Sequence, residues 1–248
     1  MFTLDPRALV RTFNSGVCLC YSACPMSDAQ TLFAAIRSGD VAQVKSLLSA
    51  DESLASARNE SGASALLSAI YSGQREIRDI LLSYVGGMDL YEAAAAGDLA
   101  RVKHLVGSDM SLANSVSPDG FPVFALACFF GHFDVARFLA EKGADIHAAA
   151  SNGSGYNALT ASVTAGHTEI VQWLLERGLD PNYRYGPGYT PLLAAAANGR
   201  LDVVKLLLSY GADPQATAND GKTAATIATE RNHPQIAEYL NSRTASAD

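Results

Sequence analysis

The sequence has few charged residues and no long apolar run. Only 17% of its 248 residues are Asp, Glu, Lys or Arg, against 48% apolar residues. No apolar run approaches the roughly 18 residues that a membrane-spanning helix needs. The 18 basic and 25 acidic residues give a net charge of −7. A chain of this charge lacks the clustered Lys and Arg that bind nucleic acid or anionic lipid, so we expect neither partner.

Cysteine is scarce and unevenly placed. Of the four cysteines, three lie in "GVCLCYSAC" as Cys18, Cys20 and Cys24. This arrangement is not a disulfide framework, so the body of the protein is compatible with a reducing compartment, the cytoplasm. A zinc site needs four ligands, and no His or Asp follows the three thiols at a suitable spacing. We therefore predict no bound metal and no other cofactor.

The sequence does contain an internal repeat, which is the first pattern to seek in any chain. The phrases "RSGD", "YSGQ", "AAGD", "FFGH", "TAGH" and "ANGR" place glycine at 39, 73, 97, 131, 166 and 199. The spacings are therefore 34, 24, 34, 35 and 33 residues. In a seventh phrase, "RNH", Asn232 stands where the next glycine is expected.

Each phrase lies between two short helical patterns, as "TPLLAAAANGRLDVVKLLLSYGADPQ" illustrates. Thr190 can cap a helix and Pro191 fits its first turn. Apolar residues recur at helical spacing on both sides of Gly199, which ends the first helix, and Gly211 ends the second. Because neither helix is long enough to be stable alone, the copies must stack on one another as a solenoid.

These patterns resemble ankyrin repeats, whose copies run near 33 residues and begin with T-P-L-H. More narrowly, the chain resembles the short, free-standing ankyrin repeat proteins common in bacteria. The resemblance implies an all-α solenoid of about seven helix-turn-helix units with short hairpin loops, over residues 28–248. The expected units are 28–60, 61–87, 88–118, 119–153, 154–186, 187–219 and 220–248.

Two features depart from the family pattern. The histidine of T-P-L-H is absent from every copy, which puts one local hydrogen bond in doubt. The 24-residue spacing leaves no room for a hairpin between "ILLSYVGGMD" and "LYEAAAAGD", so Gly86 and Gly87 would turn the chain directly into the third unit. We expect this joint to interrupt the row of hairpin tips, to be a weak interface, and to confine binding to units four to six. The histidine position is occupied by Leu67, Tyr91, Ala125, Thr160, Leu193 and Thr226.

Residues 1–27 form an extension without repeat character. The first repeat helix begins after Met26, with Ser27 or Asp28 as its cap. We interpret the extension as disordered or as lying outside the working chain. A secretion or lipidation signal is the alternative, because two arginines precede "GVCLCYSAC" and "YSAC" approaches a lipoprotein cleavage box.

The sequence also contains a loose match to a phosphate-binding loop. "ATANDGKT" ends in Gly221-Lys222-Thr223, but a true phosphate loop follows a buried strand. Here Asp220-Gly221 is interpreted as an inter-repeat turn, Lys222 as a solvated side chain and Thr223 as a helix cap. An enzyme or nucleotide-binding protein on the repeat scaffold is therefore the alternative function, not the preferred one.

The remaining chemically active residues also have structural interpretations. His132, His167 and His233 occupy one place in three units, where we expect them to cap the second helix. Cys128 is expected in the core as a small apolar residue. No G-x-S-x-G or H-E-x-x-H motif is present, so the chain is not expected to be an enzyme.

In the family, partner proteins usually meet the hairpin tips and the exposed side of the inner helices. We therefore expect a non-catalytic, monomeric protein that binds another protein, of unknown identity, through a rigid concave surface. Aromatic residues and arginine dominate interface energies, and they gather at these positions. The candidate binding residues are Tyr71, Phe121, Phe129, Phe130, Tyr156, Tyr183, Arg184, Tyr185 and Tyr189.

Overall fold

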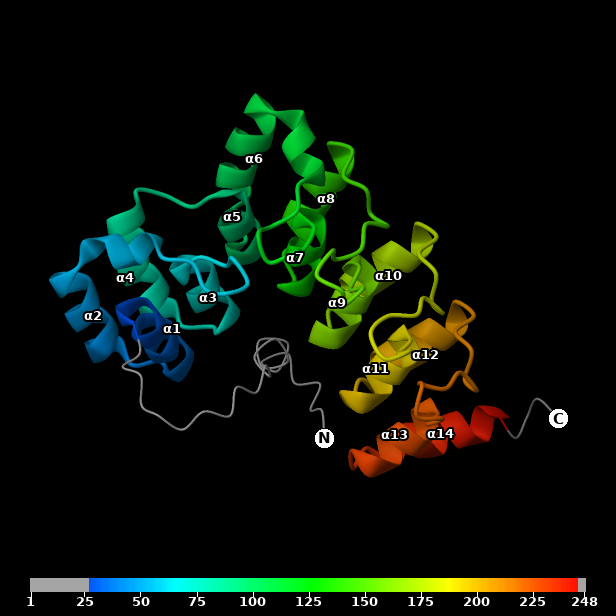
Figure 1. Ribbon diagram of the computed structural model, residues 1–248. Coiled ribbons are helices and arrows are strands. Elements are labelled where there is room, and N and C mark those ends of the chain that lie inside the picture. Colours follow the sequence, from blue (N-terminus) through cyan, green and yellow to red (C-terminus); the bar gives the residue numbers. More distant parts are fainter. Residues whose placement is uncertain (1–26, 245–248) are drawn as a thin grey trace.

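The computed structural model describes residues 27–244, and in this part of the chain the regular elements are all helices (Figure 1). The predicted all-α class is therefore confirmed. The N-terminal cysteine tract lies outside the described residues. None of the described helices is long and apolar enough to cross a membrane. The elements are α1 Asp28–Ser38, α2 Val41–Ala50, η1 Glu52–Ser56, α3 Ala65–Tyr71, α4 Arg75–Val85, α5 Leu90–Ala96, α6 Leu99–Ser108, η2 Met110–Asn114, α7 Val123–Phe129, α8 Phe133–Glu141, α9 Ala158–Ala165, α10 Thr168–Glu176, α11 Pro191–Ala197, α12 Leu201–Ser209, α13 Ala224–Glu230 and α14 Pro234–Thr244, where η marks a 3-10 helix.

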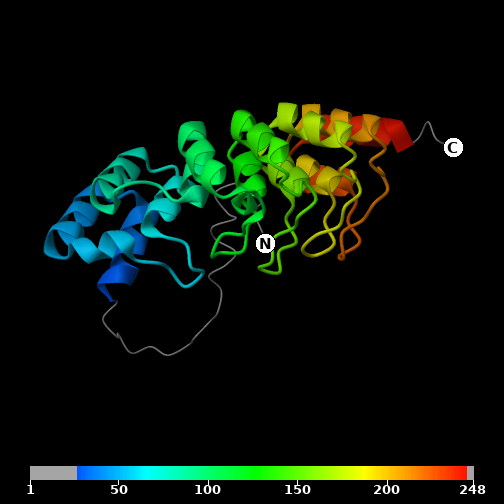
Figure 2. The same cartoon turned by 90° about the horizontal axis from the view of Figure 1, so that it is seen from above.

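The helices form two stacked rows. The odd-numbered helices make an inner row, and each is followed by an even-numbered helix of the outer row (Figure 1). Hairpins project from the inner row toward one side of the molecule (Figure 2). Within the described residues, five hairpins are each closed by one bridge pair: Arg58 with Ser64, Val116 with Pro122, Ala149 with Asn157, Tyr185 with Tyr189, and Thr217 with Thr223.

Helix α11 shows how the sequence builds one inner helix. The Thr190 hydroxyl accepts the backbone N–H of Leu193 at 3.4 Å, and Pro191 occupies the first turn, as predicted. Gly199 follows with a φ of 72°, a left-handed conformation that favours glycine. All seven residues of α11 are buried. A helix this short gains its stability from neighbours on both sides rather than from its own propensity.

Acidic and hydroxyl caps start the first and third units. Ser27, one of the two predicted caps, caps α1 in a capping box with Gln30. Asp89 caps α5 in the same way, with its side chain bonded to the N–H of Glu92 at 2.9 Å. The side chain of Glu92 in turn accepts the N–H of Asp89 at 2.8 Å.

The buried core is divided where the sequence spacing shortens. We call α1–α4 the front array and α5–α14 the rear array. One buried cluster runs from Leu32 to Leu81 in the front array, and another from Leu90 to Leu240 in the rear array. Met88 is partly buried and packs against both clusters. A third, small buried cluster of Ala63, Leu67 and Ala95 joins the front array to α5 across this division. The described residues therefore form two large hydrophobic clusters with a small one between them.

The joint between the two arrays is the segment 86–89. Helix α4 ends at Val85 and α5 begins at Leu90, with no hairpin between them. Gly86 and Gly87 turn the chain with φ values of 65° and 139°. The side chain of Arg101, in α6, donates to the Met88 carbonyl at 2.8 Å and so fixes the joint against the third unit.

The row of hairpins is nevertheless continuous across the joint. A Cβ atom added to Gly62 would lie 2.9 Å from Cβ of Pro118, so the hairpins before α3 and α7 touch directly. The expectation that the row is interrupted is wrong. Because α5 adds a helix to the inner row without adding a hairpin, the neighbouring hairpins close over the gap. The front array is consequently turned relative to the rear array (Figures 1 and 2).

Two of the repeated histidines, His132 and His167, link successive units rather than capping their own helices. Nε2 of His132 lies 3.1 Å from the Ala95 carbonyl, and Nε2 of His167 lies 2.9 Å from the Phe129 carbonyl. Neither side chain caps its own helix, so the capping prediction is wrong for both. Each covers the loop glycine of the preceding unit. The residues in this covering position are Gln74, His132, His167, Arg200 and His233, over Gly39, Gly97, Gly131, Gly166 and Gly199.

Candidate functional site

A groove of about 880 Å³ lies on the hairpin side of the molecule and crosses the joint. Its walls come from α1 and α3 of the front array and from α7 and α9 of the rear array. The three hairpins around residues 58–63, 118–121 and 151–156 complete it. The groove therefore uses units one, two, four and five, with Pro118 from the end of unit three, whereas the sequence led us to expect a surface on units four to six.

Aromatic side chains line the part of the groove above the joint. The rings of Tyr71 and Phe130 stack with their centroids 5.6 Å apart and an angle of 16° between their planes. Phe129 meets Phe130 edge-on at 5.0 Å. Tyr71 and Phe130 also pack against the buried cluster of Ala63, Leu67 and Ala95, in which Ala95 comes from the intervening helix α5. Aromatic residues of units two and four therefore meet beside unit three.

Two further predicted residues belong to the same groove. Phe121 lies at the base of the hairpin before α7 and is partly buried. Tyr156 lines the far end, but only 9% of its surface is exposed. The structure therefore brings together Tyr71, Phe121, Phe129, Phe130 and Tyr156.

A carboxylate lies beside the aromatic residues of the groove. The Tyr71 hydroxyl donates to Oδ2 of Asp119 at 2.9 Å, and the Ser117 hydroxyl donates to Oδ1 at 2.5 Å. Burial, and then the charge of Asp119, raise the pKa of Tyr71 well above its usual value, so the hydroxyl remains a donor. Asp119 is only 9% exposed and forms no ion pair within the described residues.

The sequence analysis missed Asp119. In "SPDGF" it precedes the turn glycine, and Asp at that place is explained by turn chemistry alone. Its contact with Tyr71 joins residues 48 positions apart. The one local signal for this contact is Tyr71 itself, a bulky aromatic residue just before the loop glycine of unit two and next to the shortened spacing.

Three other charged side chains line the groove near the front array. Arg37 is exposed in the last turn of α1. Arg58 is exposed and its Nη1 donates to the Gly62 carbonyl of its own hairpin at 2.9 Å. Glu60 is exposed at the tip of that hairpin. The groove therefore has an apolar floor with charges of both signs at its rim.

The remaining predicted residues belong to the hairpin before α11, outside the groove. Tyr185 is only 6% exposed, and its ring packs on Tyr156 with centroids 4.8 Å apart. The expected exposure of these two tyrosines is therefore wrong. The Tyr183 hydroxyl donates to the Gly155 carbonyl at 3.0 Å, so it also supports the neighbouring hairpin.

Arg184 and Tyr189 remain accessible on this hairpin. Nη1 of Arg184 donates to the Gly188 carbonyl at 3.2 Å and to the Thr217 carbonyl at 3.0 Å, and thereby links two hairpins. Tyr189 is partly buried against the rear core. This hairpin forms a second surface, separate from the groove.

A buried polar link supports the groove from below. The Ser64 hydroxyl donates to Oε1 of Glu92 at 2.5 Å, which joins α3 to α5 across the joint. Glu92 is 6% exposed, and burial raises its pKa above the usual value. Its second oxygen is held by the Asp89 cap described above. The two inner helices next to the joint are therefore fixed to each other by hydrogen bonds as well as by packing.

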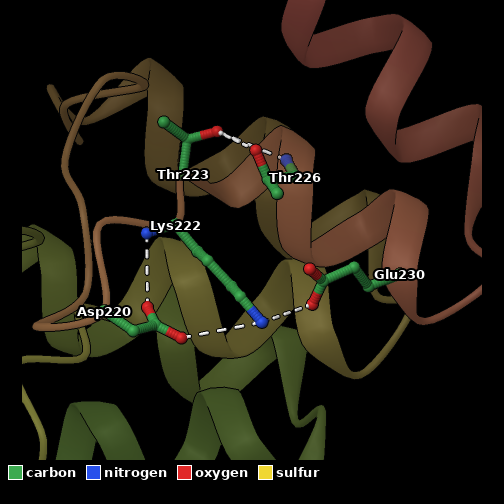
Figure 3. A network of polar contacts seen from close by, with 5 residues as sticks. All are labelled: Asp220, Lys222, Thr223, Thr226 and Glu230. Atoms are coloured by element: carbon green, nitrogen blue, oxygen red, sulfur yellow. Dashed lines mark hydrogen bonds and ion pairs between the residues drawn. The ribbon is translucent and has the colours of Figure 1, made fainter.

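The segment resembling a phosphate loop has a different geometry (Figure 3). Residues 217–223 form a hairpin, and Thr223 caps α13 by accepting the N–H of Thr226 at 3.3 Å. The Lys222 ammonium lies 2.8 Å from Oε2 of Glu230 and 3.6 Å from Oδ2 of Asp220. The lysine was expected to be solvated, but it is 40% exposed and paired with two carboxylates.

The buried thiol has no polar role in the groove. Cys128 is fully buried in α7, and burial raises its pKa well above the usual value. A thiol held in its neutral form is a poor nucleophile and metal ligand. Across residues 27–244, no three His, Cys, Asp or Glu side chains are placed to hold a metal ion together.

The sequence matches the family described as ankyrin repeats (3 copies), over residues 90–185 and 181–248. The chain therefore belongs to the ankyrin repeat family. Among curated relatives it is similar to the mouse ankyrin repeat and SAM domain-containing protein 6, with 34% identity over 92 residues. That alignment covers 37% of this chain and 10% of the mouse protein.

Two further relatives give the same picture. The rat ankyrin repeat and SAM domain-containing protein 6 is 34% identical over 96 residues, which is 39% of this chain and 11% of the rat protein. The fruit fly protein named DNA replication inhibitor plutonium is 49% identical over 51 residues, which is 21% of this chain and 28% of that protein. The chain thus aligns with about a tenth of the mouse and rat relatives, and ankyrin repeats in general mediate protein–protein interaction.

Proposed function

We propose that this protein is a non-catalytic binding module that holds a segment of a partner protein in the groove across the joint. The observation that carries this proposal is the 880 Å³ groove with its aromatic floor, built jointly by the front and rear arrays. Concave sites with apolar lining and a few polar groups are typical of binding sites. The hairpin bearing Arg184 and Tyr189 offers a further contact surface beside it.

The mechanism is presentation of a preformed surface. Phe130 is held by Tyr71 and Phe129, and the Tyr71 hydroxyl is fixed on Asp119. A surface whose side chains are already ordered loses little conformational entropy when a partner docks. The proposal takes the partner to be another protein of unknown identity, and the module to be a cytoplasmic monomer that binds neither nucleic acid nor membrane.

Phe129→Ala is the most informative change for testing this proposal. Phe129 lines the groove and contacts Phe130, but it does not pack against either main core, so its removal should leave the fold intact. Tyr210→Ala is the matched control, because Tyr210 is an exposed aromatic residue outside the groove. Aromatic anchors of an interface contribute about 2 kcal/mol or more, or about thirtyfold in affinity.

The experiment is affinity capture from the source cell, followed by binding measurements with the purified partner. The proposal expects a protein that binds the natural chain and the Tyr210→Ala variant equally, but binds Phe129→Ala about thirtyfold more weakly. A partner that binds all three proteins equally would place the interface elsewhere. Circular dichroism of the three proteins verifies that each is folded.

A further inference from the structure

We infer that the groove recognises a partner segment through a basic side chain, Lys or Arg, that pairs with Asp119 among the aromatic residues. This inference rests on the proposed function and specifies the partner's chemistry. The occupant is a peptide segment with a cationic side chain next to apolar ones. Three features of the groove support it: the unpaired carboxylate, the aromatic rings around it, and the placement of the other charges.

The carboxylate of Asp119 has unused bonding capacity. A carboxylate can accept about four hydrogen bonds, and this one accepts two, from the Tyr71 and Ser117 hydroxyls. A buried charge is unfavourable unless it is paired with an opposite charge. No Lys, Arg or His of the described chain lies within ion-pair distance of Asp119. A cation supplied from outside would complete the site.

The neighbouring rings favour a cationic side chain of some length. The Tyr71 hydroxyl is bonded to the carboxylate, and the Tyr71 ring stacks on Phe130. The Phe129 ring meets the Phe130 ring edge-on. Aromatic faces attract ammonium and guanidinium groups, and their apolar area also packs the methylene stem of Lys or Arg. A carboxylate beside aromatic rings therefore matches both ends of such a side chain.

The two arginines that line the groove leave Asp119 without an ion pair. Arg37 and Arg58 belong to the front array, and the Arg58 guanidinium is bonded to its own hairpin. Neither forms an ion pair with Asp119. The net charge of −7 also attracts a basic segment at long range, which speeds its encounter with the groove.

The test begins with a display library of random short peptides selected on the full chain. Selected peptides are sorted by competition, and those whose binding is lost in Phe129→Ala occupy the groove. The inference expects that groove-binding peptides share a Lys or Arg, and that replacing this residue by norleucine weakens binding at least about tenfold. Norleucine keeps the stem and removes the charge.

Two charge-neutralising variants locate the partner of that side chain. Asp119→Asn should weaken the basic peptide at least about tenfold and leave the norleucine peptide unchanged. Glu141→Gln is the matched control, because it removes one negative charge from an exposed position outside the groove and should change affinity by less than about twofold. Thermal unfolding of both variants shows whether the fold is retained.

The outcomes separate this inference from the proposed function. Groove-binding peptides that are neutral or acidic would overturn the cationic inference and leave the binding module intact. Equal losses in Asp119→Asn and Glu141→Gln would show that general charge attraction, not pairing with Asp119, holds the peptide, and would also overturn the cationic inference. Failure to select any peptide that depends on Phe129 would overturn both proposals.

Discussion

The hairpin tips depend on glycine for two separate physical reasons. Gly120 has a φ of 90° and Gly221 a φ of 79°, a left-handed region that is strained for residues with a Cβ. At Gly120 the neighbouring hairpin also approaches closely, because an added Cβ would lie 2.9 Å from the backbone nitrogen of Asn152. At Gly221 an added Cβ would meet nothing within 4 Å. A comparison of substitutions at the two glycines therefore distinguishes the cost of backbone strain from the cost of disturbed packing.

Gly120→Ala should destabilise the protein more than Gly221→Ala. Both variants incur the left-handed strain of about 1–2 kcal/mol. Only Gly120→Ala also forces two hairpins apart, for which we expect roughly 1–3 kcal/mol more. Urea unfolding of the three proteins measures the difference. Equal losses of unfolding free energy in both variants would show that the two hairpins can move apart without a loss of stability.

Single residues also link the units. His167 reaches across to the Phe129 carbonyl, and burial lowers its pKa below the usual value, with His132 and Arg200 contributing in the same direction. The neutral ring is therefore favoured in the folded state. Since Gln, His and Arg all occupy this covering position in different units, the shared requirement is a polar side chain long enough to reach the carbonyl or shield the loop glycine.

At the scale of elements, the joint separates two helix stacks of unequal size. The front array has four α-helices and its own core, whereas the rear array has ten and a larger one. In a repeat protein each unit is stabilised mainly by its nearest neighbours. The two arrays meet across the joint through Met88, the small buried cluster of Ala63, Leu67 and Ala95, the pair Ser64–Glu92 and the stack of Tyr71 on Phe130.

We therefore expect the front array to open at a lower free energy than the middle of the rear array. Native-state hydrogen exchange at increasing low denaturant should show amides of residues 28–87 exchanging through one opening, below that of residues 121–215. The physical reason is that the two large buried clusters are separate and that the joint has no hairpin of its own. Uniform opening free energies along the chain would contradict this prediction.

Most elements could be predicted from sequence because their signals are local. The loop glycines, the Thr190 cap and the buried stripes each depend on a few consecutive residues, and the missing hairpin at Gly86-Gly87 follows from spacing alone. The groove could not be predicted in the same way. The contact of Tyr71 with Asp119 depends on how two arrays turn relative to each other. The burial of Tyr185 depends on a neighbouring hairpin that supplies Tyr156.

At the scale of the whole molecule, the shortened joint determines the curvature. The hairpins before α3 and α7 touch, although α5 separates the helices behind them. The molecule is thus drawn together on the hairpin side, where the groove lies. Supplying the missing hairpin should reverse this arrangement.

Inserting a copy of residues 112–121 between Gly87 and Met88 should straighten the array and open the groove. The inserted hairpin would separate Gly62 from Pro118 and part the Tyr71–Phe130 stack. We expect a larger radius of gyration in small-angle X-ray scattering and loss of groove-dependent binding. The control inserts flexible Gly-Ser residues of the same number, which can loop out and should change the shape less. Equal dimensions in all three proteins would show that curvature does not depend on the joint.

The joint also breaks the translational symmetry of the molecule. In a regular array each repeat presents nearly the same surface as the next repeat, so an elongated partner could dock in several registers of similar energy. The segment 86–89 occurs once, and the contacts of Tyr71 with Phe130 and Asp119 occur only beside it. Because the joint lacks about ten residues that the other connections have, the repetitive surface contains one unique position. A chain that binds at this position can dock in only one register.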